Sequence, residues 1–303
     1  MHVDSCGWYR LMFKAIWAAV ASALAVALIV FLAVDALPVD PTRAALGSMA
    51  SAEQVAQLRA ELGLDQPVLE RLARFVWNLV RGDFGTSFFY GRPVSEILVS
   101  QVPPTLARAF AGLTAGVATG LASGRWVAGS RFESLTLATC RIAQATPALV
   151  CALVVSWVAS QGMGVSASSH PIAFGVLAAS VASIAPAAVT GQFVLQRLSS
   201  APPAHADFLR MLGAPEAAVR HILWYECLPA ALMLALNSAT GALTAVFFCE
   251  LVFGLKGFGS VFYRSCARGD VAVVIGGTVV LALLFVFFQR IGDIVGAYVD
   301  PRR

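Results

Sequence analysis

Long runs of hydrophobic residues recur along the chain, separated by shorter stretches that hold most of the charged residues. A bilayer core of about 30 Å requires roughly 20 apolar residues per helix. Six stretches meet this length and predict membrane-spanning helices at 11–34, 104–124, 135–158, 172–195, 229–252 and 271–291. Pro186 and Gly191 interrupt the fourth, and Asn237 and Gly241 interrupt the fifth. Small and weakly polar residues are common where membrane helices pack closely, so we expect buried positions there.

The segment 35–103, between the first two predicted spans, carries its own helix signals. Ser51 and Gln54 have the spacing of a capping box, in which two side chains bond each other's backbone N–H groups at a helix start. Pro67 is placed to open a second helix, amphipathic and ending at Gly82. We therefore predict a helical segment outside the membrane.

Positively charged loop residues predict the orientation, because Lys and Arg stay preferentially on the cytoplasmic side of short loops. Placing both termini in the cytoplasm brings to that side Arg10, Arg125, Arg197, Arg220 and Arg290. The run at 11–34 is too long for the core of a cleaved signal peptide, so we expect a retained span. The predicted organisation is a tail and first span at 1–34, an extracytoplasmic segment at 35–103 and a five-helix core at 104–303.

The composition supports a membrane protein and excludes other classes. Hydrophobic residues make up 58% of the 303 positions and charged residues 13%, which no water-facing surface could accommodate, so the lipid bilayer is an expected partner. The net charge of +4 forms no Lys/Arg cluster, so we expect no nucleic-acid partner. Cysteines and histidines lack metal-ligand spacing, and neither a phosphate-binding loop nor a nucleophile elbow occurs. We expect no metal, no cofactor bound by this chain and no enzymatic activity.

Ionisable residues are scarce inside the predicted spans. Arg108 lies near one end of the second span, where its side chain is expected to snorkel to the interface. Glu250 and Asp293 also lie near span ends, so the sequence predicts no midplane chain of carboxylates of the kind that a proton-driven carrier uses. This pattern counts against a secondary transporter.

Several short motifs follow one another in order along the chain. They are Leu37-Pro38-Val39-Asp40-Pro41, Leu62-Gly63-Leu64-Asp65-Gln66-Pro67, Gly82-Asp83-Phe84-Gly85-Thr86-Ser87, the run from Glu250 to Gly259, and Gly269-Asp270. In this order they resemble the permease subunits of binding-protein-dependent ABC importers of the dipeptide, oligopeptide and nickel branch. Val39 and Lys256 depart from the glycine and the proline that are usual there.

The resemblance implies the type I ABC importer permease fold, an all-α polytopic membrane protein with six transmembrane helices. It also implies a cytoplasmic coupling loop at about 197–228, through which an ATPase subunit moves the permease. The residues matched to this ATPase contact are Asp207, Phe208, Leu209, Arg210, Met211, Leu212, Gly213 and Ala214. The stretch from Asp207 to Pro229 is shorter than is usual in the family.

Two further groups of residues are site candidates. By resemblance, an outer gate or receptor-docking region involves Asp83, Phe84, Gly85, Glu250, Gly257 and Gly259. Gln144, Gln192 and Asn237 are polar positions within spans that could line a translocation path, although a hydrogen bond between helices explains such residues more often.

The partners implied by the resemblance are a second, homologous permease, two ABC ATPase subunits that use ATP and Mg, and an extracytoplasmic solute-binding protein. The expected place is the cytoplasmic (inner) membrane of a bacterium or archaeon, and the expected cargo is peptides or related solutes such as glutathione, nickel or opine-like chelates. A stand-alone secondary transporter or channel is the alternative from another class, and a membrane scaffold or sensor is a third.

Overall fold

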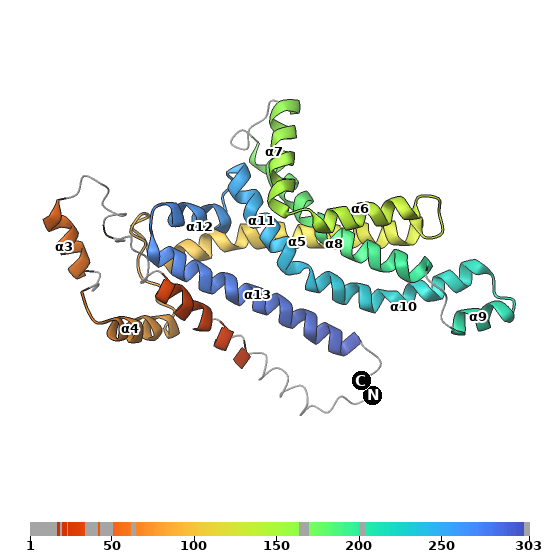
Figure 1. Ribbon diagram of the computed structural model, residues 1–303, viewed down its shortest axis with the longest axis horizontal. Coiled ribbons are helices and arrows are strands. Elements are labelled where there is room, and N and C mark those ends of the chain that lie inside the picture. The colour runs from red at the N-terminus through yellow and green to blue at the C-terminus, as the bar shows by residue number, and fades with distance from the viewer. Residues whose placement is uncertain are drawn as a thin grey trace. The chain divides into compact units, whose positions relative to one another are not determined.

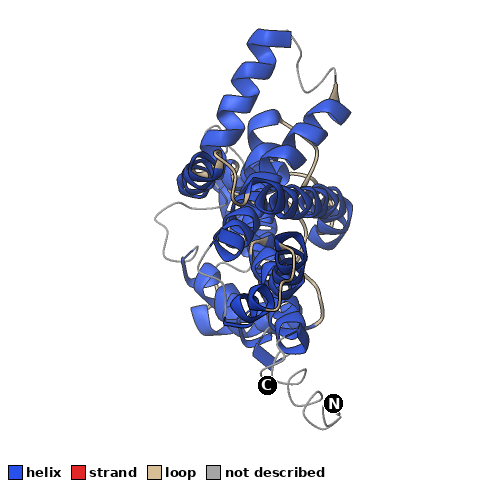
Figure 2. Ribbon diagram, turned by 90° about the vertical axis from the view of Figure 1, so that its right-hand side faces the viewer, coloured by secondary structure: helices blue, strands red, loops and turns tan. Residues whose placement is uncertain are grey.

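The computed structural model describes residues 17, 18, 20–22, 24–33, 42, 51–61, 65–163, 170–199 and 204–299. Helices joined by loops make up this part of the chain, and Figure 2 draws no strand in it. The prediction of an all-α protein is confirmed. The chain forms two compact units, one made of residues up to 103 together with 260–287, the other of 104–259 together with 288–303.

The first unit contains both helices predicted in the segment 35–103. Helix α3 (Ala52–Glu61) opens with the predicted capping box, because the Ser51 N–H donates to Gln54 Oε1 (3.0 Å) and the Gln54 N–H donates to Ser51 Oγ (3.2 Å). Helix α4 (Val68–Val80) begins directly after Pro67. Gly82 follows α4 with a φ of +74°, a left-handed conformation that glycine adopts without steric cost.

Three helices, α5 (Val94–Val127), α12 (Phe258–Ala267) and α13 (Val271–Val299), contain residues of both units. Helix α5 begins in the first unit and continues in the second. Helices α12 and α13 lie mostly in the first.

The second unit is organised around helix α8 (Pro171–Ser199), labelled in Figure 1. Its partners are α6 (Glu133–Ala145), α7 (Ala148–Met163), α10 (Glu216–Asn237) and α11 (Ala239–Phe253), and a short helix, α9 (Ala204–Met211), packs on α10. Pro186 and Gly191 of α8 are buried, as the sequence predicts. Asn237 and Gly241 are exposed in the isolated chain, contrary to expectation, because they flank Ser238, where α10 ends and α11 begins.

Within the described residues, three helical stretches are long and apolar enough to cross a membrane: Pro171–Ser199, Glu216–Phe253 and Val271–Gly292. They agree with the fourth, fifth and sixth predicted spans. The second predicted span lies within α5, which contains Arg108 and is not among these three. The described residues of the first span are helical, and the rest of 11–34 lies outside the described residues. The number of six spans therefore stays a prediction.

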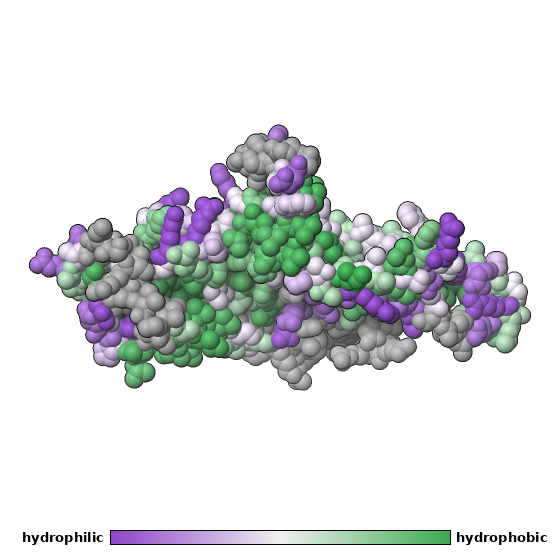
Figure 3. Space-filling model, turned by 45° about the horizontal axis from the view of Figure 1, so that its top comes forward, coloured by the Kyte–Doolittle hydropathy of each residue, from purple (hydrophilic) through white to green (hydrophobic). Residues whose placement is uncertain are grey.

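The predicted span at 135–158 is broken by a sharp bend. Helices α6 and α7 meet there at an angle of 102°. Thr146, at the bend, is extended with a ψ of 122°, since the ring of Pro147 disfavours helical geometry in the preceding residue. The sequence shows this proline, but hydropathy averaged over the run hides its effect. Figure 3 shows hydrophobic side chains gathered over α7, and Leu153, Val154 and Trp157 are exposed there.

A row of glycines on α5 allows this helix to approach α8 closely, a feature that the hydropathy pattern did not single out. Gly112, Gly116, Gly120 and Gly124 recur every four residues, so they lie on one face of the helix. A methyl group on Gly116 would lie 2.5 Å from the Ser183 carbonyl oxygen, and one on Gly124 would lie 2.7 Å from Val194 Cβ. Small residues at such spacing are typical of membrane helices whose backbones touch.

We predict that Gly120→Ala lowers the thermal unfolding temperature of the purified protein by several degrees. The new methyl would come within 2.6 Å of the Ala187 carbonyl oxygen, and overpacking of this kind costs about 1–3 kcal/mol. The matched control is Gly241→Ala on α11, where the added methyl meets no atom within 4 Å. An unfolding temperature equal to the wild type for Gly120→Ala would contradict close packing at this position.

Candidate functional site

The predicted coupling residues form α9 and the turn that leads into α10. The turn ends α9 through three hydrogen bonds, in which the N–H groups of Leu212, Gly213 and Ala214 donate to the carbonyl oxygens of Phe208, Arg210 and Leu209. Gly213 has a φ of +78°, the left-handed conformation that a glycine after a helix commonly adopts. Pro215 then precedes the first turn of α10 in an extended conformation. The sequence thus builds a compact helix–turn–helix connection.

One face of this connection is anchored and the other is largely exposed. Ala206 of α9 packs with Val219 and Leu223 of α10, and Leu209 lies against the same cluster. On the other side, the exposed fractions are 59% for Phe208, 84% for Met211 and 68% for Leu212. We call Phe208, Met211 and Leu212 the apolar tip. Apolar side chains held in the open by an anchored helix are typical of a protein-contact surface.

Arg210 braces α9 against α10 by electrostatic contacts. Its Nη2 and Nε donate to the two carboxylate oxygens of Glu216 at 2.8 and 3.0 Å, and its Nη1 donates to Asp207 Oδ1 at 3.1 Å. The hydrogen bonds with Glu216 and Asp207 raise the pKa of the Arg210 guanidinium, which stays charged. The bidentate contact between Arg210 and Glu216 fixes the angle between α9 and α10.

Glu250, predicted for the outer region, is fully buried near the end of α11. Its Oε1 accepts hydrogen bonds from Arg108 Nη1 and Thr105 Oγ1, both at 2.7 Å, and its Oε2 accepts one from the Gly259 N–H at 2.8 Å. Thr105 Oγ1 in turn accepts a hydrogen bond from the Phe258 N–H. We call these five residues the Glu250 cluster. It joins α5, the end of α11 and the start of α12.

The expectation that Arg108 snorkels away is wrong, because its guanidinium turns inward to Glu250 and to the Lys256 carbonyl oxygen. A buried carboxylate requires a positive partner, so the acid at 250 was the signal that could have predicted the pair. Gly257 and Gly259 are explained by the same cluster. A methyl group on Gly257 would overlap the Glu250 carboxylate, and one on Gly259 would lie 2.6 Å from the Phe247 carbonyl oxygen.

Asp83, Phe84 and Gly85 belong to the first unit and form a turn there. Asp83 Oδ1 accepts a hydrogen bond from the Gly85 N–H at 2.9 Å, and Gly85 has a φ of +79°. Phe84 packs against Gly276 of α13. A second link follows two residues later, where Ser87 Oγ donates to Asp270 Oδ2 at 2.5 Å. The turn is therefore held on α13 by packing and by a buried hydrogen bond.

Two of the three residues considered for a translocation path, Gln144 and Gln192, contact each other. Gln144 Nε2 of α6 donates to Gln192 Oε1 of α8 at 2.6 Å, which is the hydrogen bond between helices that the sequence analysis weighed as the alternative. Asn237 lies at the end of α10, where its Oδ1 faces Gly292. Across the described residues, no group of three His, Cys, Asp or Glu side chains is placed to hold a metal ion.

We predict that Arg108→Met destabilises the protein by about 3 kcal/mol, since it leaves the buried Glu250 carboxylate without its cation. Arg108→Met combined with Glu250→Gln is expected to be more stable than Arg108→Met alone, because glutamine is neutral, its single carbonyl oxygen can accept from the Gly259 N–H, and its NH2 can donate to Thr105 Oγ1. Thermal unfolding in detergent measures both, with the exposed Arg131→Met as control. A double variant no more stable than the single one would contradict the pairing.

Known proteins resemble this chain over almost its whole length. A protein family described as "Binding-protein-dependent transport system inner membrane component" matches residues 112–303, and its N-terminal companion matches 8–109. A Brucella abortus protein, named provisionally as a peptide transport system permease, is 26% identical over 96% of this chain and 98% of its own.

Two further relatives carry more definite names. The glutathione transport system permease protein GsiC of Salmonella paratyphi A is 29% identical over 92% of this chain and 93% of its own. The oligopeptide transport system permease protein OppB of Haemophilus influenzae is 25% identical over 82% and 85%. These matches confirm the resemblance that the ordered motifs indicate. The chain belongs to the inner membrane component family of binding-protein-dependent transport systems, and it is a permease subunit of an ABC importer.

Proposed function

We propose that this chain receives the movement of an ABC ATPase through the apolar tip and passes it to the membrane helices through α10. The observation that carries the proposal is the apolar tip itself, exposed on a helix that packing and Arg210 attach to α10. Exposed apolar side chains gain free energy when a partner covers them. Helix α9 has only eight residues, so a partner bound at the apolar tip acts close to α10.

The packing beyond α9 supports a stiff connection. The stretch Glu216–Phe253 contains both α10 and α11, and both helices pack against α8. Glu250 lies near the far end of that stretch and anchors it to α5 through Arg108. A displacement of α9 therefore acts on a packed group of helices that can move as one body between two states.

We further propose that the cargo is a peptide or a glutathione-like peptide. The support comes from the relatives, which are named peptide, glutathione and oligopeptide permeases. Nickel or a metal chelate, considered from the sequence, has no such support among them. The proposed assembly contains a second, homologous permease, two ATPases and an extracytoplasmic solute-binding protein, in an inner membrane with both termini of this chain in the cytoplasm and six spans.

The extracytoplasmic side of this arrangement is also a proposal. Segment 35–103, with α3 and α4, would face the binding protein, and the Asp83–Gly85 turn would shape the docking region. The Glu250 cluster would hold the outer end of the α11–α12 connection. Gly257 and Gly259 contribute by leaving space for the Glu250 carboxylate.

We predict that Met211→Asp abolishes co-purification of the ATPases with this permease, since the charge would have to be desolvated in an apolar contact. Binding-protein-dependent peptide uptake in proteoliposomes should fall at least tenfold. The matched control for ATPase co-purification is Leu69→Asp on α4, where the wild-type side chain is 78% exposed, close to the 84% of Met211. Normal ATPase binding by Met211→Asp would overturn the assignment of the apolar tip.

We predict that Gly213→Pro leaves membrane insertion intact but uncouples ATP hydrolysis from uptake. Proline cannot adopt the φ of +78° found at this position and has no N–H to donate to the Arg210 carbonyl oxygen, so α9 would leave its place on α10. The measurement compares ATP consumed with peptide imported. An unchanged ratio would show that the α9 turn does not transmit movement.

A further inference from the structure

A cavity of about 330 Å³ opens between the ends of α5 and α8 and the beginning of α10, within the second unit. The residues that line it are Arg125, Trp126, Leu198, Ala217, Arg220, His221 and Trp224. Two arginines, a histidine and two tryptophans are an unusual lining for a chain in which only 13% of residues are charged. The apolar tip and the Glu250 cluster contain none of these seven residues, although Leu198 also packs against the cluster that anchors α9.

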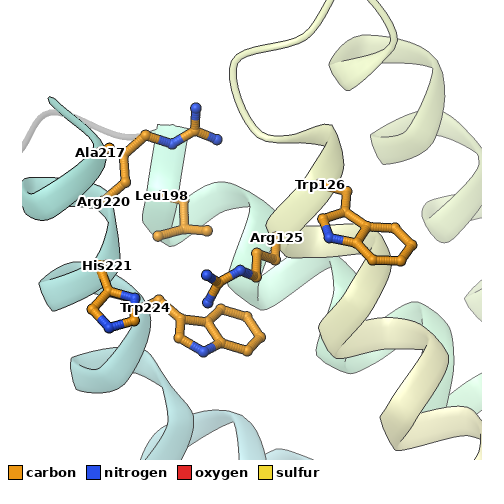
Figure 4. A pocket seen from close by; sticks show the side chains of 7 residues that line it. All are labelled: Arg125, Trp126, Leu198, Ala217, Arg220, His221 and Trp224. Carbon is orange, nitrogen blue, oxygen red and sulfur yellow. The ribbon is translucent and has the colours of Figure 1, made fainter.

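The two arginines approach the cavity from opposite helices. In Figure 4, Arg125 extends from α5 and Arg220 from α10, with Leu198 of α8 between them. The Arg125 guanidinium lies over the Trp224 ring, 5.0 Å from its centroid. Arg220 Nη2 donates to the Ala128 carbonyl oxygen at 2.7 Å, which orients its side chain.

The positive charge at this cavity is not cancelled by its lining. In the described part of the chain, the lining includes no Asp or Glu. The acid next to it in sequence, Glu216, accepts its hydrogen bonds from Arg210 and also interacts electrostatically with Arg220. An aromatic ring and a backbone carbonyl, the two contacts of Arg125 and Arg220 given above, orient an arginine without neutralising it. The cavity therefore attracts an anion with several acceptor oxygens, such as a phosphate group.

The residues around the cavity favour the phosphate of a lipid headgroup over a soluble phosphate. Trp126 is 80% exposed beside the cavity, and Trp224 forms one of its walls. Tryptophan is enriched at the membrane–water interface, where its ring contacts acyl chains while its N–H reaches water. The cavity also lies at the ends of helices that are apolar along their length. Basic pockets between membrane helices commonly bind anionic lipid headgroups.

We propose that this cavity binds the phosphate headgroup of an anionic phospholipid. Arg125 and Arg220 hold the phosphate oxygens, Trp224 stacks beneath Arg125, and Trp126 lies along the acyl chains. The first turns of α10 form one wall of the cavity and also carry α9. A bound lipid therefore also holds in place the part of α10 on which α9 packs. The assignment concerns lipid binding alone and does not depend on the proposed transport function.

The test is native mass spectrometry of the purified full chain, released from detergent in the presence of phosphatidylglycerol. The wild type should retain one phosphatidylglycerol per chain, and Arg125→Gln should weaken this binding about fivefold, the factor expected for one basic residue near a lipid surface. Arg125→Lys should keep most of the affinity. The matched control, Arg141→Gln, changes an exposed arginine of α6 outside the cavity and should leave binding unchanged.

Three results would overturn the proposal. They are equal retention by wild type and Arg125→Gln, an equal loss in Arg141→Gln, and displacement of the lipid by millimolar inorganic phosphate, which would point to a soluble anion instead. Trp126→Leu guards against a folding artefact, because it keeps both arginines and removes a ring that is 80% exposed. It should also weaken phosphatidylglycerol retention while the thermal unfolding temperature stays within a few degrees of the wild type.

Discussion

The close approach of α5 to α8 is the constraint on which the second unit depends. Four glycines at intervals of four residues remove every side chain from one face of α5, so the backbone of α8 takes that place. Lipid tails are as apolar as the helices, and association in a membrane therefore relies on such close packing rather than on burial of apolar area. Helices α6, α7, α10 and α11 then pack on the remaining surface of α8.

Polar contacts between helices select one arrangement among those that the close packing of α5 on α8 would allow. The Glu250 carboxylate is satisfied by a cation, a hydroxyl and a backbone N–H, so a group that would be costly alone becomes a firm junction between α5, α11 and α12. Gln144 and Gln192 join α6 to α8 in the same manner with neutral groups. Each contact selects one arrangement of helices that apolar packing by itself would not distinguish from its neighbours.

Helix α10 connects two surfaces of different chemistry. Its first turns carry the anchored α9 with its apolar tip, and the next turn carries Arg220, His221 and Trp224 at the basic cavity. A protein partner suits the first surface, since its exposed side chains are uncharged. A lipid phosphate suits the second, since its charges lack a counterion in the lining. Both surfaces are attached to the first turns of α10, so occupation of either bears on the position of the other.

The sequence by itself determined the helical class, the capping box of α3, the three spans at 172–195, 229–252 and 271–291, and the ordered motifs of the permease family, because these depend on local periodicity and spacing. The tertiary structure alone decided the bend at Pro147, the inward turn of Arg108 and the basic cavity. Hydropathy averages over a window and so conceals one proline. The pairing of Arg108 with Glu250 joins residues distant in the chain, and Arg125 and Arg220 likewise come from distant segments to line one cavity. Only the packing of α5 against its neighbours places them there.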